Sequence, residues 1–112
     1  MAEISKDHQE KIQKMQLLEQ NLQNLLNQRQ QFEQQLAEIE SALNESSDSK
    51  NTYKIIGNIM VSVDKNSLKK ELNDKKEVLT LRIKAIEKQE EIMREKAKKL
   101  QEEVLSNIKG KK

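Results

Sequence analysis

Residues 52–64 read TYKIIGNIMVSVD, and this stretch decides the fold that the sequence predicts. Two runs of β-branched and apolar residues, TYKII and IMVSV, flank the dipeptide Gly57-Asn58. Such a dipeptide closes a two-residue hairpin loop, because glycine adopts a positive φ without steric cost. The stretch therefore predicts a β-hairpin over residues 52–63.

Both faces of this hairpin carry apolar side chains. An isolated two-stranded hairpin is marginally stable in water, and its unpaired edges can pair with further strands. We therefore expect hairpins from several subunits to join in one sheet or barrel, which makes the hairpin an assembly device. The expected assembly residues are Ile56, Ile59, Val61 and Val63 on one face and Tyr53, Ile55 and Met60 on the other, with Ile56 opposite Ile59 and Ile55 opposite Met60.

The segments on either side of the hairpin have the composition and spacing of long helices. Of the 112 residues, 36% are charged and 34% are hydrophobic, with no proline and two glycines. Apolar residues recur at alternating spacings of three and four over about residues 4–43 and 66–108, which predicts two coiled-coil helices. The predicted seam is Ile4, His8, Lys11, Met15, Leu18, Leu22, Leu25, Arg29, Phe32, Leu36, Ile39 and Leu43, then Leu72, Lys76, Leu79, Ile83, Ile86, Glu90, Met93, Ala97, Leu100 and Val104.

The two helical segments are nearly equal in length, as an antiparallel pair requires if each seam is to be covered. Residues 1–50 carry a net charge of −4 and residues 51–112 one of +6, so the arms attract; the alternative is a solvated charge pattern without a pairing role. The polar stretch 44–51, NESSDSKN, is expected to be a loop, and Asn66 or Ser67 to cap the second helix. The prediction is one mainly α domain, a long antiparallel two-helix coiled coil with one β-hairpin at the bend.

Several classes of function are disfavoured. One histidine, no cysteine and two glycines leave no common metal site, nucleophile and base pair or phosphate-binding loop, so no catalytic, cofactor or metal residues are expected. His8 is interpreted as a polar seam residue, and Arg29 and Glu90 as easing each other's place in the seam. Phe32 and Tyr53 give no stacking platform for nucleic acid, and no apolar run approaches the roughly 18 residues of a membrane span. We expect a cytoplasmic protein.

The order of these segments resembles the β-type subunit of prefoldin, in particular the archaeal form. The most specific motifs are Tyr53-Lys54 leading into Gly57-Asn58-Ile59, and residues 79–91, LTLRIKAIEKQEE. The resemblance covers nearly the whole chain, although the first helix matches only as a Gln-rich coiled coil. A single hairpin departs from the α-type subunit, which has two.

The resemblance implies a hexamer of two α-type and four β-type subunits, whose hairpins form a β-barrel platform that carries six coiled coils. Such a complex captures non-native proteins without ATP and delivers them to a group II chaperonin. The alternative is a structural coiled-coil scaffold or tether that oligomerises through its hairpin. A simple rod needs no sheet at its bend, so the hairpin is the feature that separates these functions.

Both termini are expected at the end of the coiled coil that is remote from the hairpin. Apolar residues there would form a client-binding tip through non-directional burial; the alternative is that they finish the coiled coil. The basic tail, residues 109–112, is a candidate element for docking to an acidic chaperonin surface, or else a solubilising tail. The candidate tip residues are Met1, Ile4, Ile12, Val104, Leu105 and Ile108, and the candidate docking residues are Lys109, Lys111 and Lys112.

Overall fold

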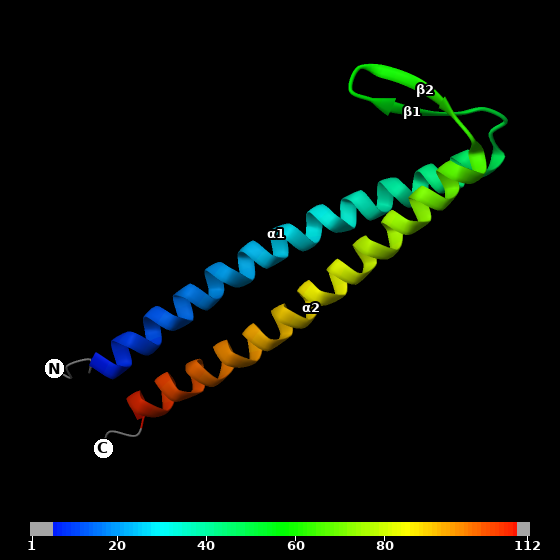
Figure 1. Ribbon diagram of the computed structural model, residues 1–112. Helices are drawn as coiled ribbons and strands as arrows, with labels where there is room; N and C mark the ends of the chain where they lie inside the picture. The colour runs from blue at the N-terminus through cyan, green and yellow to red at the C-terminus, as the bar shows by residue number, and fades with distance from the viewer. Residues whose placement is uncertain (1–5, 110–112) are drawn as a thin grey trace. The chain divides into compact units, whose positions relative to one another are not determined.

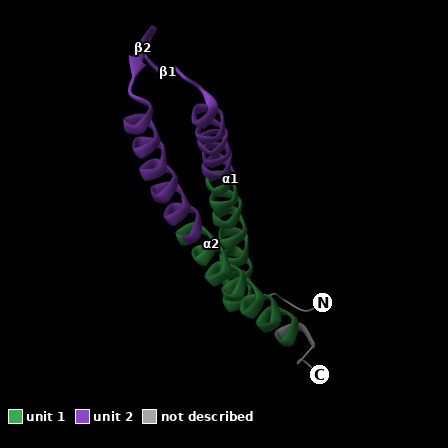
Figure 2. Cartoon of the chain, turned by 90° about the vertical axis from the view of Figure 1, so that its right-hand side faces the viewer, with its two compact units in different colours: residues 1–29, 85–112 green, residues 30–84 purple. Residues whose placement is uncertain are grey.

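The computed structural model describes the backbone of residues 6–109 and the side chains of residues 6–106. In chain order (Figure 1) the elements are helix α1 (Lys6–Asp48), strands β1 (Thr52–Ile56) and β2 (Ile59–Val63), and helix α2 (Lys65–Lys109). No 18-residue stretch of the helices, as far as they are described, is apolar enough to cross a membrane. The chain divides into two compact units (Figure 2), residues 1–29 with 85–112 as unit 1 and residues 30–84 as unit 2.

Unit 1 pairs the first part of α1 with the last part of α2. The Lys11 Nζ lies 3.3 Å from a carboxylate oxygen of Glu103, and the Arg29 Nε lies 2.7 Å from one of Glu90. Residue numbers therefore rise along one helix while they fall along the other. The two helical segments of unit 1 are antiparallel.

Unit 2 contains the remaining parts of both helices and the hairpin between them. The Lys76 Nζ lies 3.9 Å from a carboxylate oxygen of Glu40. The guanidinium carbon of Arg82 lies 5.8 Å from the centre of the Phe32 ring, within cation–π distance. These pairs also align the helices antiparallel, so the predicted fold class of the chain, two long antiparallel helices with one hairpin, is confirmed.

Burial along both helices follows the predicted seam. Every seam position among the described side chains is buried or half-buried, including the polar positions His8 and Lys76. Among the described side chains, the buried apolar ones are Leu79, Ile83 and Ile86, and all three belong to α2. Since only one side of each helix is covered, most other side chains are exposed, as the low hydrophobic content requires.

A charged group lies within the seam of unit 1. The Glu90 side chain is only 2% exposed, and both of its oxygens are engaged. Arg29 donates to them at 2.7 and 3.4 Å from α1, and Arg94 donates at 3.4 Å from one turn further along α2. A buried carboxylate is tolerated when it is paired and hydrogen-bonded in this way. The predicted role of Arg29 and Glu90 is confirmed.

Helix α1 extends further than the sequence indicated. Residues 44–51 were expected to be a loop, but α1 continues to Asp48 and the connection is only residues 49–51. The Ser46 and Ser47 hydroxyls donate to carbonyls three residues earlier, at 3.1 and 2.8 Å. Such local bonds to the backbone are compatible with a helix. The Lys65 ammonium donates to the Ser47 carbonyl at 2.6 Å and satisfies an acceptor of the last turn.

The cap of α2 is Asp64, not Asn66 or Ser67 as the sequence suggested. A carboxylate oxygen of Asp64 accepts a hydrogen bond from the Ser67 amide at 3.1 Å and from the Ser67 hydroxyl at 3.3 Å. The Asp64 carbonyl accepts the first helical bond, from the Leu68 amide at 2.9 Å. Aspartate is as good a cap as asparagine or serine and also carries charge that favours the helix N-terminus, which explains the earlier start.

The hairpin has the predicted register. Strand β1 pairs antiparallel with β2, with Ile56 opposite Ile59 and Ile55 opposite Met60. Gly57 has a φ of +61°, as the first loop position of a type II′ turn requires.

Removing the buried carboxylate should show how the seam tolerates charge. In Glu90→Leu, the half-buried Arg29 guanidinium would lose its 2.7 Å hydrogen bond to this carboxylate, so we expect a loss of about 1.5–3 kcal/mol of unfolding free energy. The double variant Arg29→Leu, Glu90→Leu should regain most of that loss, because neither charge remains. Urea unfolding followed by circular dichroism measures both. Equal destabilisation of the single and double variants would contradict this account.

Candidate functional site

The hairpin presents apolar side chains to solvent on both faces. On the face of Ile55 and Met60, these side chains are 70% and 65% exposed. On the face of Ile56 and Ile59, the exposed fractions are 58% and 66%. Tyr53 and Val61 are exposed as well, whereas Val63, at the base, is half-buried. A soluble chain rarely exposes so many neighbouring apolar side chains unless another surface covers them.

Near its base, the hairpin has one side-chain hydrogen bond between its strands and one to α2. The Thr52 hydroxyl donates to the Val63 carbonyl at 2.8 Å, and Thr52 is buried. The Lys54 ammonium donates to a carboxylate oxygen of Glu71 on α2 at 2.6 Å. This hydrogen bond, more than the opposing desolvation, lowers the pKa of Glu71 below its usual value of 4.5, and Lys54 and Lys75 add charge attraction. The pair therefore links the hairpin to the helix whenever Glu71 is ionised.

The second predicted site lies in unit 1, where α1 begins and α2 ends. Ile12 and Val104 are half-buried in the pair, and Leu105 is 46% exposed. Ile108 and Lys109 lie in α2, but their side chains are outside the described part. Other predicted residues lie outside the described residues altogether, namely Met1, Ile4, Lys111 and Lys112. The structure brings Ile12 and Val104 into the same unit on opposite helices.

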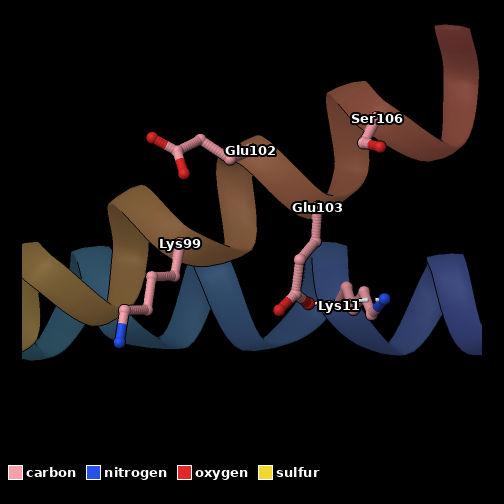
Figure 3. Close-up of a pocket in the computed structure, with 5 residues that line it drawn as sticks. All are labelled: Lys11, Lys99, Glu102, Glu103 and Ser106. Atoms are coloured by element: carbon pink, nitrogen blue, oxygen red, sulfur yellow. Dashed lines mark ion pairs between the residues drawn. The ribbon is translucent and has the colours of Figure 1, made fainter.

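A cluster of charged side chains links the two helices beside these apolar residues. The Lys11 ammonium lies 3.3 Å from a carboxylate oxygen of Asp7 and 3.3 Å from one of Glu103, and Figure 3 shows the second pair. Partial burial lowers the pKa of Lys11, but the hydrogen bonds and charge attraction of the two carboxylates outweigh it and leave the pKa raised. Figure 3 shows Glu103 reaching from α2 toward Lys11, whereas Glu102 points away. The first turns of α1 are thereby joined to the last turns of α2.

Several exposed apolar side chains were missed by reasoning from the sequence. They lie on the two helices but outside the seam, where the heptad pattern assigns solvent-facing positions. For three of the four, the signal in the sequence is an apolar residue next to a seam residue, as in Leu17 beside Leu18, whereas Leu81 has polar neighbours. The residues are Leu17, Val78, Leu81 and Ile92. Within the described part of the chain, no group of His, Cys, Asp or Glu side chains is placed to hold a metal ion.

Two paired helices with one β-hairpin between them are also the arrangement of a known family. The sequence model of prefoldin subunits matches residues 9–111. The chain belongs to the prefoldin family. The prefoldin beta subunit of Pyrobaculum islandicum is 37% identical over 98% of this chain and 93% of its own length. That of Methanospirillum hungatei is 36% identical over 100% and 96%, and that of Saccharolobus islandicus is 40% identical over 93% and 86%.

The structural comparison gives the same assignment. The crystal structure of the prefoldin beta subunit from Thermococcus strain KS-1 superposes with a TM-score of 0.89. It shares 30% sequence identity, and the match covers 96% of each chain. The predicted resemblance to the β-type subunit is confirmed, and the chain is a chaperone subunit of a prefoldin complex. Because prefoldins are not enzymes, the prediction that the chain has no catalytic activity is confirmed by its family.

Proposed function

We propose that this chain acts in the cytoplasm as one of four β-type subunits that assemble with two α-type subunits into a prefoldin hexamer. The hexamer captures non-native polypeptides without ATP and delivers them to a group II chaperonin. The hairpins form its shared β-barrel platform, and the paired helix ends of unit 1 hold the client.

The observation that carries the proposal is the exposure of apolar side chains on both faces of the hairpin. One face of a hairpin can be covered by helices of its own chain, but here neither is covered beyond the base: Ile55 is 70% exposed and Ile59 is 66% exposed. Burial of these side chains in a barrel with other hairpins would recover about 1.5–3 kcal/mol for each one that is fully covered. A simple coiled-coil rod requires no such surface, whereas a tether that oligomerises through its hairpin would bury it too and differs from the chaperone in holding no client.

Client capture is assigned to the end of the helix pair in unit 1. There the apolar side chains of Ile12 and Val104 are only partly covered, and Leu105 is exposed beside them. Contacts of this kind depend on apolar area and not on direction, so they fit many sequences. Each contact is weak, but several helix pairs in one complex raise the effective concentration of binding sites for a long client. Release requires no nucleotide, because a chaperonin can compete for the same apolar segments.

The tip residues should be necessary for capture. We expect the hexamer that carries Ile4→Ser, Ile12→Ser, Leu105→Ser and Ile108→Ser to lose most of its ability to suppress aggregation of a denatured protein without ATP, because apolar contact area is removed. Light scattering of the diluted client measures this.

A matched control removes exposed apolar side chains elsewhere on the helices, by Val78→Ser, Leu81→Ser and Ile92→Ser. It should suppress aggregation as the unchanged hexamer does. Client capture that is the same for the tip variant and the unchanged hexamer would refute the tip assignment.

The basic tail is assigned to chaperonin docking through Lys109, Lys111 and Lys112. Deleting residues 109–112 should weaken binding of the hexamer to the chaperonin at low salt and have less effect at high salt, because exposed charges are screened. Surface plasmon resonance at two salt concentrations checks this. Binding that does not depend on the tail at either concentration would leave it a solubilising segment.

A further inference from the structure

A shallow groove of about 390 Å³ runs between α1 and α2 in unit 1, beside the seam. Three leucines supply its apolar lining. Leu18 and Leu100 are half-buried seam residues, whereas Leu17 is 58% exposed and lies off the seam. The coiled coil does not need Leu17 for its own packing, so the groove offers apolar surface beyond that of the seam.

The rim of the groove is basic. Lys14 from α1 and Lys96 and Lys99 from α2 line it, and none of these ammonium groups forms an ion pair with any side chain that the structure describes. The one carboxylate at the rim, Glu103, is already engaged by Lys11 at 3.3 Å. The groove therefore presents three lysines and one carboxylate, which Lys11 already engages, around an apolar lining.

The lining residues share one spacing on the two helices. On α1 they are Lys14, Leu17, Leu18 and Asn21, and on α2 they are Lys96, Lys99, Leu100 and Glu103. Residues at intervals of three, four and seven share one helix face. Both helices thus expose a two-turn strip along the same groove, and an amphipathic helix that lays its apolar face into a groove needs such a surface.

We propose that this groove docks an acidic amphipathic segment of a non-native polypeptide. The apolar face of the segment covers Leu17, Leu18 and Leu100, and its flanking carboxylates pair with Lys14, Lys96 and Lys99. This inference rests on the proposed capture of clients and adds a preferred class of segment and a binding surface on the side of the helix pair. Because lysine side chains are flexible and apolar contacts are non-directional, the groove would select segments by their charge and amphipathic pattern and not by one sequence.

The test uses the full chain assembled with its α-type partner and a fluorescent synthetic peptide. The peptide has leucines at helical spacing flanked by glutamates. A second peptide carries lysine in place of each glutamate, and a third scrambles the order of the first. Fluorescence anisotropy gives the affinity of the assembly for each peptide.

The acidic amphipathic peptide should bind most tightly of the three. The triple variant Lys14→Gln, Lys96→Gln, Lys99→Gln should weaken its binding by about tenfold, as expected for three exposed ion pairs. The matched control removes the same charge from α2 outside the groove, by Lys84→Gln, Lys88→Gln and Lys98→Gln, and should bind nearly as the unchanged assembly does. Leu17→Ser should weaken binding of the acidic peptide, since apolar area is lost.

Equal binding of the acidic and basic peptides, or equal effects of the groove and control lysine variants, would overturn the inference. Cross-linking that places a second copy of this chain in the groove would do so too. Aggregation of a denatured protein is measured in parallel. An assembly that suppresses aggregation without preferring the acidic peptide refutes the groove assignment alone, whereas one that holds no denatured protein refutes the proposed function.

Discussion

The central physical constraint on this chain is that a two-stranded hairpin with apolar side chains on both faces cannot remain uncovered in water. The side chains of Ile55, Ile59 and Met60 are each about two-thirds exposed. Such a hairpin gains stability only from partners on both faces and at its edges. Two features fix the hairpin in place. Gly57 closes its turn, and Lys54 joins it to Glu71 of α2. The fold thus leaves apolar side chains exposed that the proposed assembly would bury.

The two helices, by contrast, bury their seam side chains against each other within each unit. The seam covers one side of each helix, and the low hydrophobic content leaves little further surface to bury. The buried Glu90 adds a requirement that an apolar seam lacks, because a shifted alignment would separate it from Arg29 of α1 and leave it only Arg94 of its own helix. The Arg29–Glu90 pair therefore favours one register of the two helices, as polar core residues do in other coiled coils.

Much of this arrangement could be predicted because it depends on periodicity and on backbone chemistry. The 3,4 spacing predicted the seam, and the Gly57-Asn58 dipeptide predicted the hairpin register. The seam also brought Arg29 and Glu90 together, since two charges at core positions require each other. The helix ends were less predictable. Serine and aspartate side chains bond to the backbone both inside helices and at their ends, so these residues alone do not locate a helix end. In the structure, α1 continues to Asp48 and α2 is capped by Asp64.

The groove around Leu17 was not predicted, because the heptad pattern treats positions outside the seam as solvated. Its charge arises from lysines that are distant in sequence, Lys14 and Lys96, and only the pairing of the helices brings them to one rim. The candidate tip was predicted from chain order alone. Of its residues with described side chains, Leu105 is exposed while Ile12 and Val104 are partly covered.

The most direct test of the central claim is the mass of the assembly formed with an α-type prefoldin partner, measured by light scattering for the unchanged chain and for Ile55→Ser, Ile59→Ser. The account predicts a hexamer of two α-type and four β-type subunits for the unchanged chain. For the variant it predicts loss of the hexamer with helical content retained, because the helices do not depend on the hairpin faces. A hexamer that forms equally well with the variant would contradict the claim that the exposed hairpin drives assembly.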